Sequence, residues 1–322
     1  MKVVDRRRLN TRGERAVYRE AHMLDIIDRD TPGTIHLHHF FDEPTHFYII
    51  TEYAPGGNLL NRVIRKNKLS EDDAKPILRS ILQCLIYHHN NGTVHRNLKP
   101  DNILLDGKYA LIADYGLAAQ LMYDDIGEMQ LFTARCGTSA YVSPEILNKQ
   151  PYATQVDMWG VGIIAYMCLL GYPPFADESK QVLFARISKA DYTIDQQDWS
   201  NISRLAKRFI SSLLHVDPVV RMTAEEALDH PWLLSSIPDV PESQSAVADT
   251  SEVIFPVAKK SIKKSSTMTL RRVLSSLLSS KKKVDGADKY CDDASTSSHD
   301  TSILSSSDVA GRRMLRGYER GN

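Results

Sequence analysis

The sequence predicts an α+β protein with two lobes, a small strand-rich N-terminal lobe and a larger, mainly helical lobe, followed by a polar tail. Two short strand patterns, at residues 35–41 and 46–53, precede a Pro-Gly-Gly break at residues 55–57. Residues 156–170 are apolar on all sides, which indicates a helix buried in a large core. After residue 235 the chain is rich in Ser, Asp and Lys and poor in aromatic residues, as disordered segments are. The expected parts are therefore 1–54, 55–235 and 236–322.

Helix and strand signals fill both lobes in order. Residues 1–5 are expected to end a strand, and residues 13–28 to form a helix with apolar residues at helical spacing. Ser70 opens a capping-box-like helix start, in which Pro76 is expected to kink the helix or delay its beginning. Gly171 is expected to end the buried helix. Further helices are expected at residues 202–214 and after a capping box at 223–226.

The composition is that of an ordinary globular protein. Of the 322 residues, 42% are hydrophobic and 25% are charged, and the formal net charge is zero, which gives no argument for a nucleic-acid partner. No apolar run is long enough to span a bilayer, and the N-terminus is too polar for a signal peptide. The four cysteines are far apart, without a CxxC pair. This usage indicates a reduced, intracellular protein, located in the cytoplasm or alternatively in the nucleus.

A polar loop at residues 94–105, which read VHRNLKPDNILL, is the centre of the sequence. Asp114-Tyr115-Gly116 follows Asn102 by twelve residues, again behind an apolar run. An ammonium, an amide oxygen and a carboxylate suit a magnesium-bound polyphosphate, because Mg²⁺ prefers oxygen ligands. Alone, Asp114-Tyr115-Gly116 would be an ordinary turn, but the loop ahead of it at this distance favours a functional site.

These motifs, with Ser143-Pro144-Glu145 behind them, resemble in type and order those of the eukaryotic protein kinases. The details are most similar to Ser/Thr kinases of the calcium/calmodulin-dependent type. The resemblance runs from Lys2 to Trp232 and implies a bilobal protein kinase fold with an incomplete N-terminal β-lobe. It implies transfer of the γ-phosphoryl group of ATP to Ser or Thr of a protein, with ATP and Mg²⁺ as cofactors.

Lys2 and Glu20 resemble the family pair in which a strand lysine holds the α- and β-phosphates and a helix glutamate holds the lysine. The alternative is a pair of solvated surface charges. The family has a glycine-rich hairpin before this lysine, and this sequence does not contain it. We therefore hypothesise that Met1 is an internal methionine of a longer protein, and we expect weak nucleotide binding by this chain.

The resemblance also implies roles for residues of the hinge and the polar loop. Lys99 is expected to neutralise the transferring phosphate, and Asn102 and Asp114 to ligate Mg²⁺. Further nucleotide contacts are expected from the backbones of Glu52 and Ala54, from Leu104 below the adenine, and from Asn58, which replaces the usual glutamate near the ribose.

Asn97 stands where the family has its catalytic aspartate. Asparagine is nearly isosteric and can form hydrogen bonds, but its amide has no useful basicity. General-base catalysis is typically worth about 10²–10⁴-fold. Because phosphoryl transfer has a loose transition state, positioning and metal are expected to leave some residual rate. We expect impaired activity; the alternatives are a pseudokinase acting as a signalling scaffold or binding module, and a non-functional truncated product.

Other positions match the family's supporting architecture. Glu145 and Arg221 match a buried ion pair, whose partners are retained together because one buried charge alone is costly. Asp157 is expected to hold the backbone of the polar loop, and Thr138 to brace Lys99 and the catalytic position at residue 97. The four expected inter-lobe stacking positions are Leu24, Leu37, His95 and Tyr115. Arg96 is expected to bind an anion, either phosphorylated Thr133 or the carboxylates of Asp124, Asp125 and Glu128.

The tail contains one patterned segment. Apolar residues at helical spacing between 268 and 280 lie among Lys and Arg, which predicts a regulatory amphipathic helix. Residues 259–284 could bind calmodulin, as tails of relatives do, or an anionic membrane surface. The alternative is a solvated basic tail, since four serines weaken the helix. Ser275 is also a candidate phosphorylation site for a basic-directed kinase.

Overall fold

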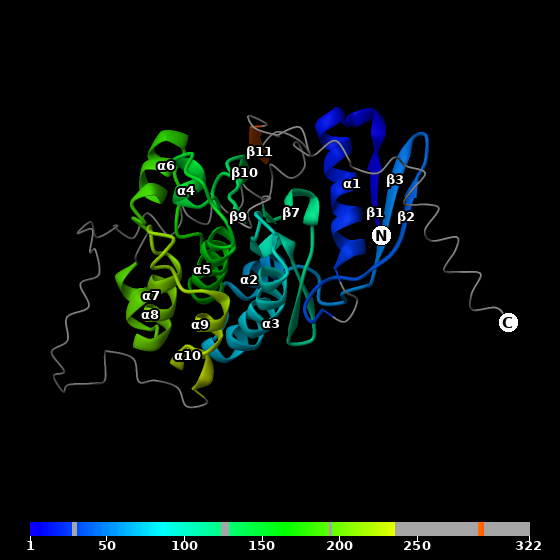
Figure 1. Ribbon diagram of the computed structural model, residues 1–322. Helices are drawn as coiled ribbons and strands as arrows, with labels where there is room; N and C mark the ends of the chain where they lie inside the picture. The colour runs from blue at the N-terminus through cyan, green and yellow to red at the C-terminus, as the bar shows by residue number, and fades with distance from the viewer. Residues whose placement is uncertain (28–30, 124–128, 193–194, 236–288, 293–322) are drawn as a thin grey trace, which may run out of the picture.

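The computed structural model describes residues 1–27, 31–123, 129–192 and 195–235, and the backbone of residues 289–292. A small lobe made of one helix and a sheet stands beside a larger helical lobe (Figure 1). The predicted α+β class is confirmed. In the described ranges, no helix combines the length and apolar character needed to cross a membrane.

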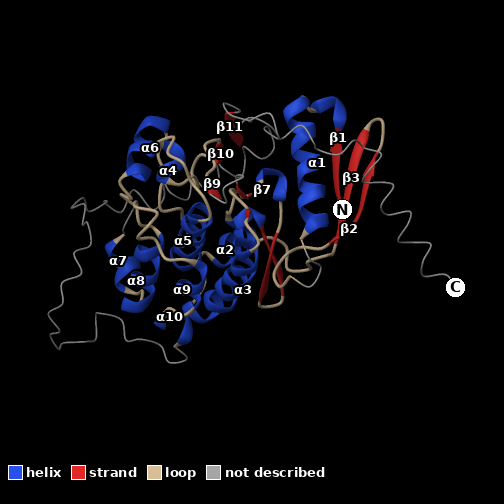
Figure 2. Cartoon of the chain, in the orientation of Figure 1, coloured by secondary structure: helices blue, strands red, loops and turns tan. Residues whose placement is uncertain are grey.

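The small lobe is a three-stranded antiparallel sheet packed against one helix (Figure 2). Asn10 accepts a hydrogen bond from the backbone N–H of Gly13 and so caps α1 (Thr11–Ile26), which begins and ends two residues earlier than predicted. The ring of Tyr18 packs edge-on against Phe47 of the sheet, with centroids 5.3 Å apart. The strands, in spatial order, are β1 (Lys2–Asp5), β3 (His46–Thr51) and β2 (Leu37–Asp42).

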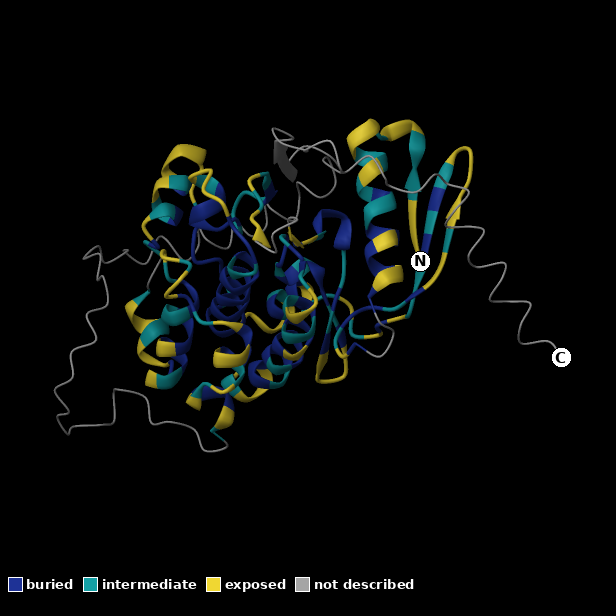
Figure 3. Ribbon diagram, in the orientation of Figure 1, coloured by how far each residue is buried: buried dark blue, intermediate teal, exposed yellow. Residues whose placement is uncertain are grey.

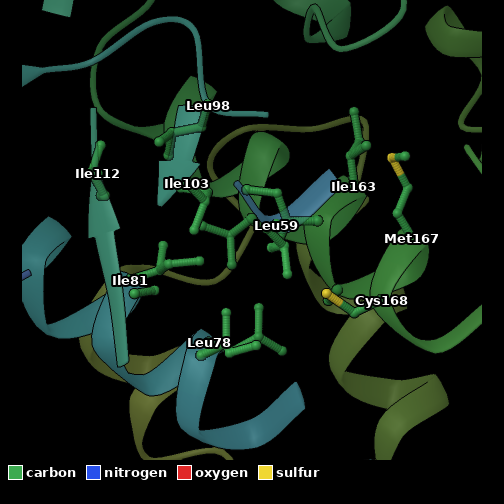
Figure 4. Packing of buried hydrophobic residues seen from close by; sticks show 14 of the residues in the cluster. Leu59, Leu78, Ile81, Leu98, Ile103, Ile112, Ile163, Met167 and Cys168 are labelled. Carbon is green, nitrogen blue, oxygen red and sulfur yellow. The ribbon is translucent and has the colours of Figure 1, made fainter. Parts of the chain in front are cut away.

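The larger lobe is built around α5 (Gln155–Leu170), in which all residues but the first are buried (Figure 3). The helix ends at Gly171, as predicted, in a left-handed conformation with φ 83°. Apolar side chains of α5 meet those of α2 (Leu59–Lys66), of α3 (Glu71–Asn90) and of the polar loop in one core. This core contains Leu59, Leu78, Leu98 and Ile163 (Figure 4). The other helices of the lobe are α4 (Pro144–Leu147), α6 (Lys180–Ser188), α7 (Gln196–Ser200), α8 (Arg204–Leu213), α9 (Ala224–Leu228) and α10 (Pro231–Leu234).

The helix α3 begins after Ser70, as predicted. Ser70 caps the helix by accepting a hydrogen bond from the N–H of Asp73, and Glu71 is its first residue. Pro76 therefore lies inside the helix and does not delay its start. Three acidic residues in the first turn stabilise it by offsetting the helix dipole. The predicted capping box at Thr223 is confirmed, with Glu226 completing it.

Short strand pairs position the polar loop. Residues 95–102 of the loop lie between β4 (Thr93–Val94) and β5 (Ile103–Asp106), and β5 forms a hairpin with β6 (Tyr109–Ile112). Asp114 follows β6 and precedes a 3-10 turn at Tyr115–Leu117. The remaining pairs of this region are β4 with β7 (Ala119–Gln120) and β8 (Met122–Tyr123) with β9 (Met129–Gln130).

Four residues of the tail are described as a strand. The strand β11 (Lys289–Asp292) pairs antiparallel with β10 (Arg135–Thr138), with Cys291 opposite Cys136. The edge of β10 offers backbone groups for pairing, and Tyr is a residue that strands favour. The predicted helix at 268–280 and the candidate calmodulin segment at 259–284 lie outside the described residues.

Candidate active site

Three side chains from three separate elements meet where the two lobes face each other. Nζ of Lys2 on β1 donates a hydrogen bond to Oε2 of Glu20 on α1 at 2.6 Å and lies 3.6 Å from Oδ1 of Asp114. Glu20 is buried, whereas the side chain of Lys2 is half-exposed. Burial lowers the pKa of Lys2, but the charges of Glu20 and Asp114 outweigh this effect and raise the pKa above its ordinary value. Lys2 therefore stays an ammonium ion beside the two carboxylates.

The backbone holds Asp114 in this place. Its φ of 65° and ψ of 67° are left-handed, a conformation that Asp tolerates better than most residues. The N–H of Ala113 donates to the carbonyl of Asn102 at 2.9 Å and ties the Asp114 segment to the polar loop. The helix α1 packs on the turn that follows Asp114, and Arg19 donates to the carbonyl of Gly116 at 3.4 Å. The site therefore depends on contact between the lobes.

Asn102 and Asp114 offer oxygen atoms to a hard cation. The side-chain nitrogen of Asn102, Nδ2, donates to the backbone carbonyl of Asn97 at 2.9 Å. The side-chain oxygen of Asn102, Oδ1, is the atom of this amide that can accept or bind a cation. In the described ranges no group of three or more His, Cys, Asp and Glu side chains could hold a metal. Two protein ligands completed by phosphate oxygens and water are the usual surroundings of Mg²⁺ in nucleotide sites. The residues present therefore fit Mg²⁺ bound together with a polyphosphate.

Asp157, at the beginning of α5, holds the backbone of the polar loop by hydrogen bonds. Its carboxylate accepts hydrogen bonds from the backbone N–H groups of His95 and Arg96 at 2.9 and 2.8 Å, and Nε2 of His89 lies 3.1 Å away. Burial raises the pKa of Asp157, but these partners outweigh it and lower the pKa overall. The bonds also fix Arg96 at a φ of 62°, which is strained for a residue with a side chain.

His95 and Tyr115 connect the polar loop to the turn after Asp114. Their rings pack edge to face with centroids 4.9 Å apart, and both residues are fully buried. Because a carbonyl only accepts, Nε2 of His95 donates to Ala113 at 3.1 Å, and Nδ1 accepts from the N–H of Asn97 at 3.3 Å. Burial lowers the pKa of His95, so the ring is neutral. With His95 and Tyr115, the buried Leu24 and Leu37 make up the four predicted stacking positions.

Lys99, Thr138 and Asn97 form a chain of hydrogen bonds. Nζ of Lys99 donates to Oγ1 of Thr138 at 3.0 Å, and this hydroxyl donates to Oδ1 of Asn97 at 3.2 Å. Asn97 is buried, with 4% of its surface exposed. Among the described residues, its Nδ2 nevertheless has no hydrogen-bond partner. A buried donor without a partner costs about 1–3 kcal/mol. A stabilising interaction with a ligand would offset that cost.

The predicted hinge residues have local partners. The Glu52 carboxylate accepts from the N–H of His36 at 2.8 Å, and the Glu52 N–H donates to the carbonyl of the same residue at 3.0 Å. Ala54 is buried, and its carbonyl accepts from the N–H of Gly57 at 3.3 Å. Leu104 is half-buried and forms an isolated antiparallel β-bridge with Asn58. The Asn58 side chain caps α2 by accepting from the N–H of Asn61. Asn58 thus has a structural role, which its place before an apolar helical run could have indicated.

Comparison with known proteins identifies the family. Residues 1–233 match the family model described as protein kinase domain. The chain belongs to the protein kinase family. It is 41% and 42% identical to calcium/calmodulin-dependent protein kinase type 1 of Caenorhabditis briggsae and Caenorhabditis elegans, over 62% and 60% of this chain. These alignments span 55% of the length of either relative. The protein of the same description from Macrobrachium nipponense is 36% identical over 77% of this chain and 71% of its own length.

The matches make this chain a member of the Ser/Thr protein kinase family that is similar to the calcium/calmodulin-dependent kinases, and protein kinases in general use ATP and Mg²⁺. The kinase carries Asn97 in the loop between β4 and β5, where the pattern has aspartate. The roles of Lys2, Glu20, Lys99, Asn102 and Asp114 stay predictions, although the structure brings Lys2, Glu20 and Asp114 within ion-pair distance.

Arg96 of the kinase has partners other than the predicted anion. Its Nε donates to the carbonyl of Leu117 at 2.7 Å, and its guanidinium lies 4.9 Å from the ring centroid of Phe132. Thr133 is exposed. The acidic residues predicted to supply charge, at 124, 125 and 128, lie outside the described residues.

Sequence reasoning missed a buried polar cluster behind Tyr115. Oγ1 of Thr34 lies 2.9 Å from Nε2 of His88 and 3.2 Å from Sγ of Cys84. The rings of His88 and Tyr115 pack edge to face, 5.6 Å apart. Burial lowers the pKa of His88 to about 3 and raises that of Cys84 to about 12. No sequence signal links residues that lie 50 or more positions apart without a recognisable motif.

Proposed function

We propose that this kinase transfers the γ-phosphoryl group of ATP to Ser or Thr of a protein substrate at a strongly reduced rate, with Mg²⁺ as cofactor. The observation that carries the proposal is the meeting of Lys2, Glu20 and Asp114, with Nζ of Lys2 at 2.6 and 3.6 Å from the two carboxylates. Bound magnesium nucleotide supplies the phosphoryl group and the cation that neutralises its charge. Lys2 would hold the phosphates, and Asn102 and Asp114 the cation.

The reduced rate follows from Asn97. Its amide can hold a hydroxyl group by a hydrogen bond, but it does not take up the proton that the hydroxyl must lose. The absence of a general base lowers a rate by about 10²–10⁴-fold. Lys99, whose Nζ lies 3.0 Å from Oγ1 of Thr138, still offers an ammonium group in the same loop as Asn97. Positioning and charge therefore account for the residual rate.

The test is a γ-phosphate transfer assay that compares the natural kinase with Asn97→Asp on a Ser/Thr peptide mixture. We expect a gain of about 10²–10⁴-fold for Asn97→Asp, because a carboxylate restores the base. Gln196→Glu is the matched control, since it exchanges an amide for a carboxylate at an exposed position of α7. An unchanged rate in a folded Asn97→Asp protein would overturn the proposal.

A second candidate function is a pseudokinase that binds a protein client as a scaffold. It is supported by the buried ion pair of Glu145 and Arg221, which keeps the helical lobe intact without a catalytic base at residue 97. The same assay separates the two functions. A scaffold gives no transfer even as Asn97→Asp, while Mg²⁺ and ATP still raise its melting temperature.

Calmodulin is the proposed regulatory partner. The support is the basic amphipathic pattern at residues 259–284 and the description of the relatives as calcium/calmodulin-dependent. A synthetic 259–284 peptide titrated with calcium-loaded calmodulin tests it. Binding at micromolar concentration or below is expected and disappears with EDTA, and no binding in that range would contradict the proposal.

A further inference from the structure

The hydrogen bonds around Thr138 fix the direction in which the amide of Asn97 points. An ammonium group only donates, so the hydroxyl of Thr138 accepts from Lys99 and has its own proton to give. The hydroxyl donates this proton to Oδ1 of Asn97 at 3.2 Å. Rotation of the amide by half a turn would remove the acceptor of this proton. Nδ2, a pure donor, is therefore the atom of Asn97 left for a ligand.

This arrangement reverses the polarity of the position. A carboxylate at residue 97 would present an oxygen that accepts from a substrate hydroxyl, whereas Asn97 presents N–H groups that need an acceptor. A hydroxyl can accept from Nδ2, but its own proton then faces no acceptor on Asn97. A phosphate or carboxylate oxygen accepts without this conflict, and such charged bonds are the stronger ones. Asn97 also adds no negative charge to repel an anion next to Lys99.

We infer that the Asn97 position is a binding site for an anionic side chain of a partner protein, with phosphoserine as the best ligand and aspartate as a weaker one. The nitrogen is buried and has no partner among the described residues. The inference rests on the proposed function only in taking this cleft as the place where a peptide binds. The site selects the product form of a phosphorylated peptide over its unphosphorylated form.

The test uses the full chain and three fluorescent peptide pools, identical except for Ser, Asp or phosphoserine at a fixed central position. Anisotropy titrations are expected to show the phosphoserine pool binding at least about tenfold tighter than the Ser pool, with the Asp pool between them. Asn97→Asp should abolish or reverse this order, because it introduces a repelling charge. Gln196→Glu should leave the order unchanged. Thr138→Val should weaken the preference, since the amide is then free to rotate.

Equal binding of the Ser and phosphoserine pools by the natural chain would overturn the inference without needing any variant. That result is also expected if Nδ2 instead serves a trapped water in the small cavity that Asn97 and Ser143 both line. In a separate titration, inorganic phosphate competes with the fluorescent phosphoserine pool for the kinase. Displacement of the peptide by phosphate as effectively as by an unlabelled phosphoserine pool would assign the site to a free anion and overturn the choice of a protein ligand.

The proposed function and this inference fail separately. A gain in phosphoryl transfer by Asn97→Asp with no phosphoserine preference in the natural chain refutes the inference alone. A phosphoserine preference that disappears in Asn97→Asp, without any transfer by either protein, refutes the proposed function and supports the inference.

Discussion

Arg221 and Glu145 lie 76 residues apart in the sequence and form a bidentate ion pair inside the helical lobe, with N–O distances of 2.7 and 3.0 Å. Both side chains are almost fully buried. The same guanidinium donates to the carbonyl of Gln155 at 2.7 Å and lies 5.1 Å from the ring centroid of Trp159. The pair therefore fixes α4, which contains Glu145, to the beginning of α5 and to the loop before α9.

Replacing only one partner of this pair is expected to destabilise the kinase strongly. Arg221→Met leaves the carboxylate of Glu145 buried without its counter-charge, which costs about 3–5 kcal/mol of the free energy of unfolding. Urea denaturation followed by circular dichroism measures the loss. Arg204→Met, at an exposed position of α8, is the control, with a change within about 0.5 kcal/mol. A loss below about 1 kcal/mol for Arg221→Met would show that the pair does not hold the lobe together.

Stability is expected to fall on mild acidification because of His88. Its folded pKa of about 3 lies far below the ordinary value of 6.5, so the unfolded chain binds more protons between these values. The stabilising contribution is complete above pH 6.5 and is lost as the pH falls toward 3. In that range His88 contributes about 1.4 kcal/mol for each pH unit. His95, whose pKa is also lowered by burial, acts in the same direction.

Denaturation curves at pH 7, 6 and 5 test this dependence. His88→Gln keeps a hydrogen-bonding group near Thr34 but does not titrate, so stability should fall less steeply with acid than in the natural kinase. His22→Gln, on α1, is the comparison variant and should leave the slope unchanged. Parallel slopes for the natural kinase and His88→Gln would refute the assignment.

Much of the site could be predicted from sequence because its residues lie in short motifs. Asn102 and Asp114 each sit a few positions from other recognisable residues, and the loop motif fixes their distance along the chain. The pairing of Lys2 with Glu20 could be inferred only by resemblance, since a strand and a helix must first pack together. In the structure, Nζ of Lys2 lies 2.6 Å from Oε2 of Glu20.

What sequence could not predict depends on contacts between distant residues. The direction of the Asn97 amide is set by Thr138, which lies 41 positions away and itself accepts from Lys99. The His88 cluster likewise needs Thr34 from another part of the chain. The pairing of β11 with β10 depends on an available strand edge, which the composition of the tail does not reveal. In each case packing, and not local propensity, decides the outcome.

The polar loop is expected to be sensitive to a methyl group added at Gly160 on α5. A Cβ there would lie 2.7 Å from Cβ of Leu98 and 3.0 Å from its carbonyl oxygen. Leu98 stands between Asn97 and Lys99, so Gly160→Ala should displace both. We expect a loss of about 1–3 kcal/mol of stability and weaker binding of magnesium nucleotide.

Gly13→Ala is the matched control for this substitution. It also lies in a helix, α1, but its new Cβ would meet the flexible end of Leu9 at 3.0 Å, where the side chain can move. Alanine is also favoured over glycine in a helix. Thermal denaturation with and without Mg²⁺ and ATP compares the two variants. If Gly160→Ala behaves like Gly13→Ala, close packing of α5 does not position the loop.

The cation site gives the last prediction, through Asp114. Its carboxylate lies 3.6 Å from Lys2 and, with the Asn102 oxygen, makes up the proposed protein ligands of Mg²⁺. Asp114→Asn removes the charged ligand, so the rise in melting temperature caused by ATP should no longer depend on Mg²⁺. The natural kinase should lose the same part of the rise when EDTA removes the metal. Asp106→Asn, exposed at the end of β5, is the control and should keep the full magnesium effect. A magnesium effect of natural size in Asp114→Asn would place the cation elsewhere, and the meeting of Lys2, Glu20 and Asp114 would then be a structural ion-pair cluster and not a nucleotide site.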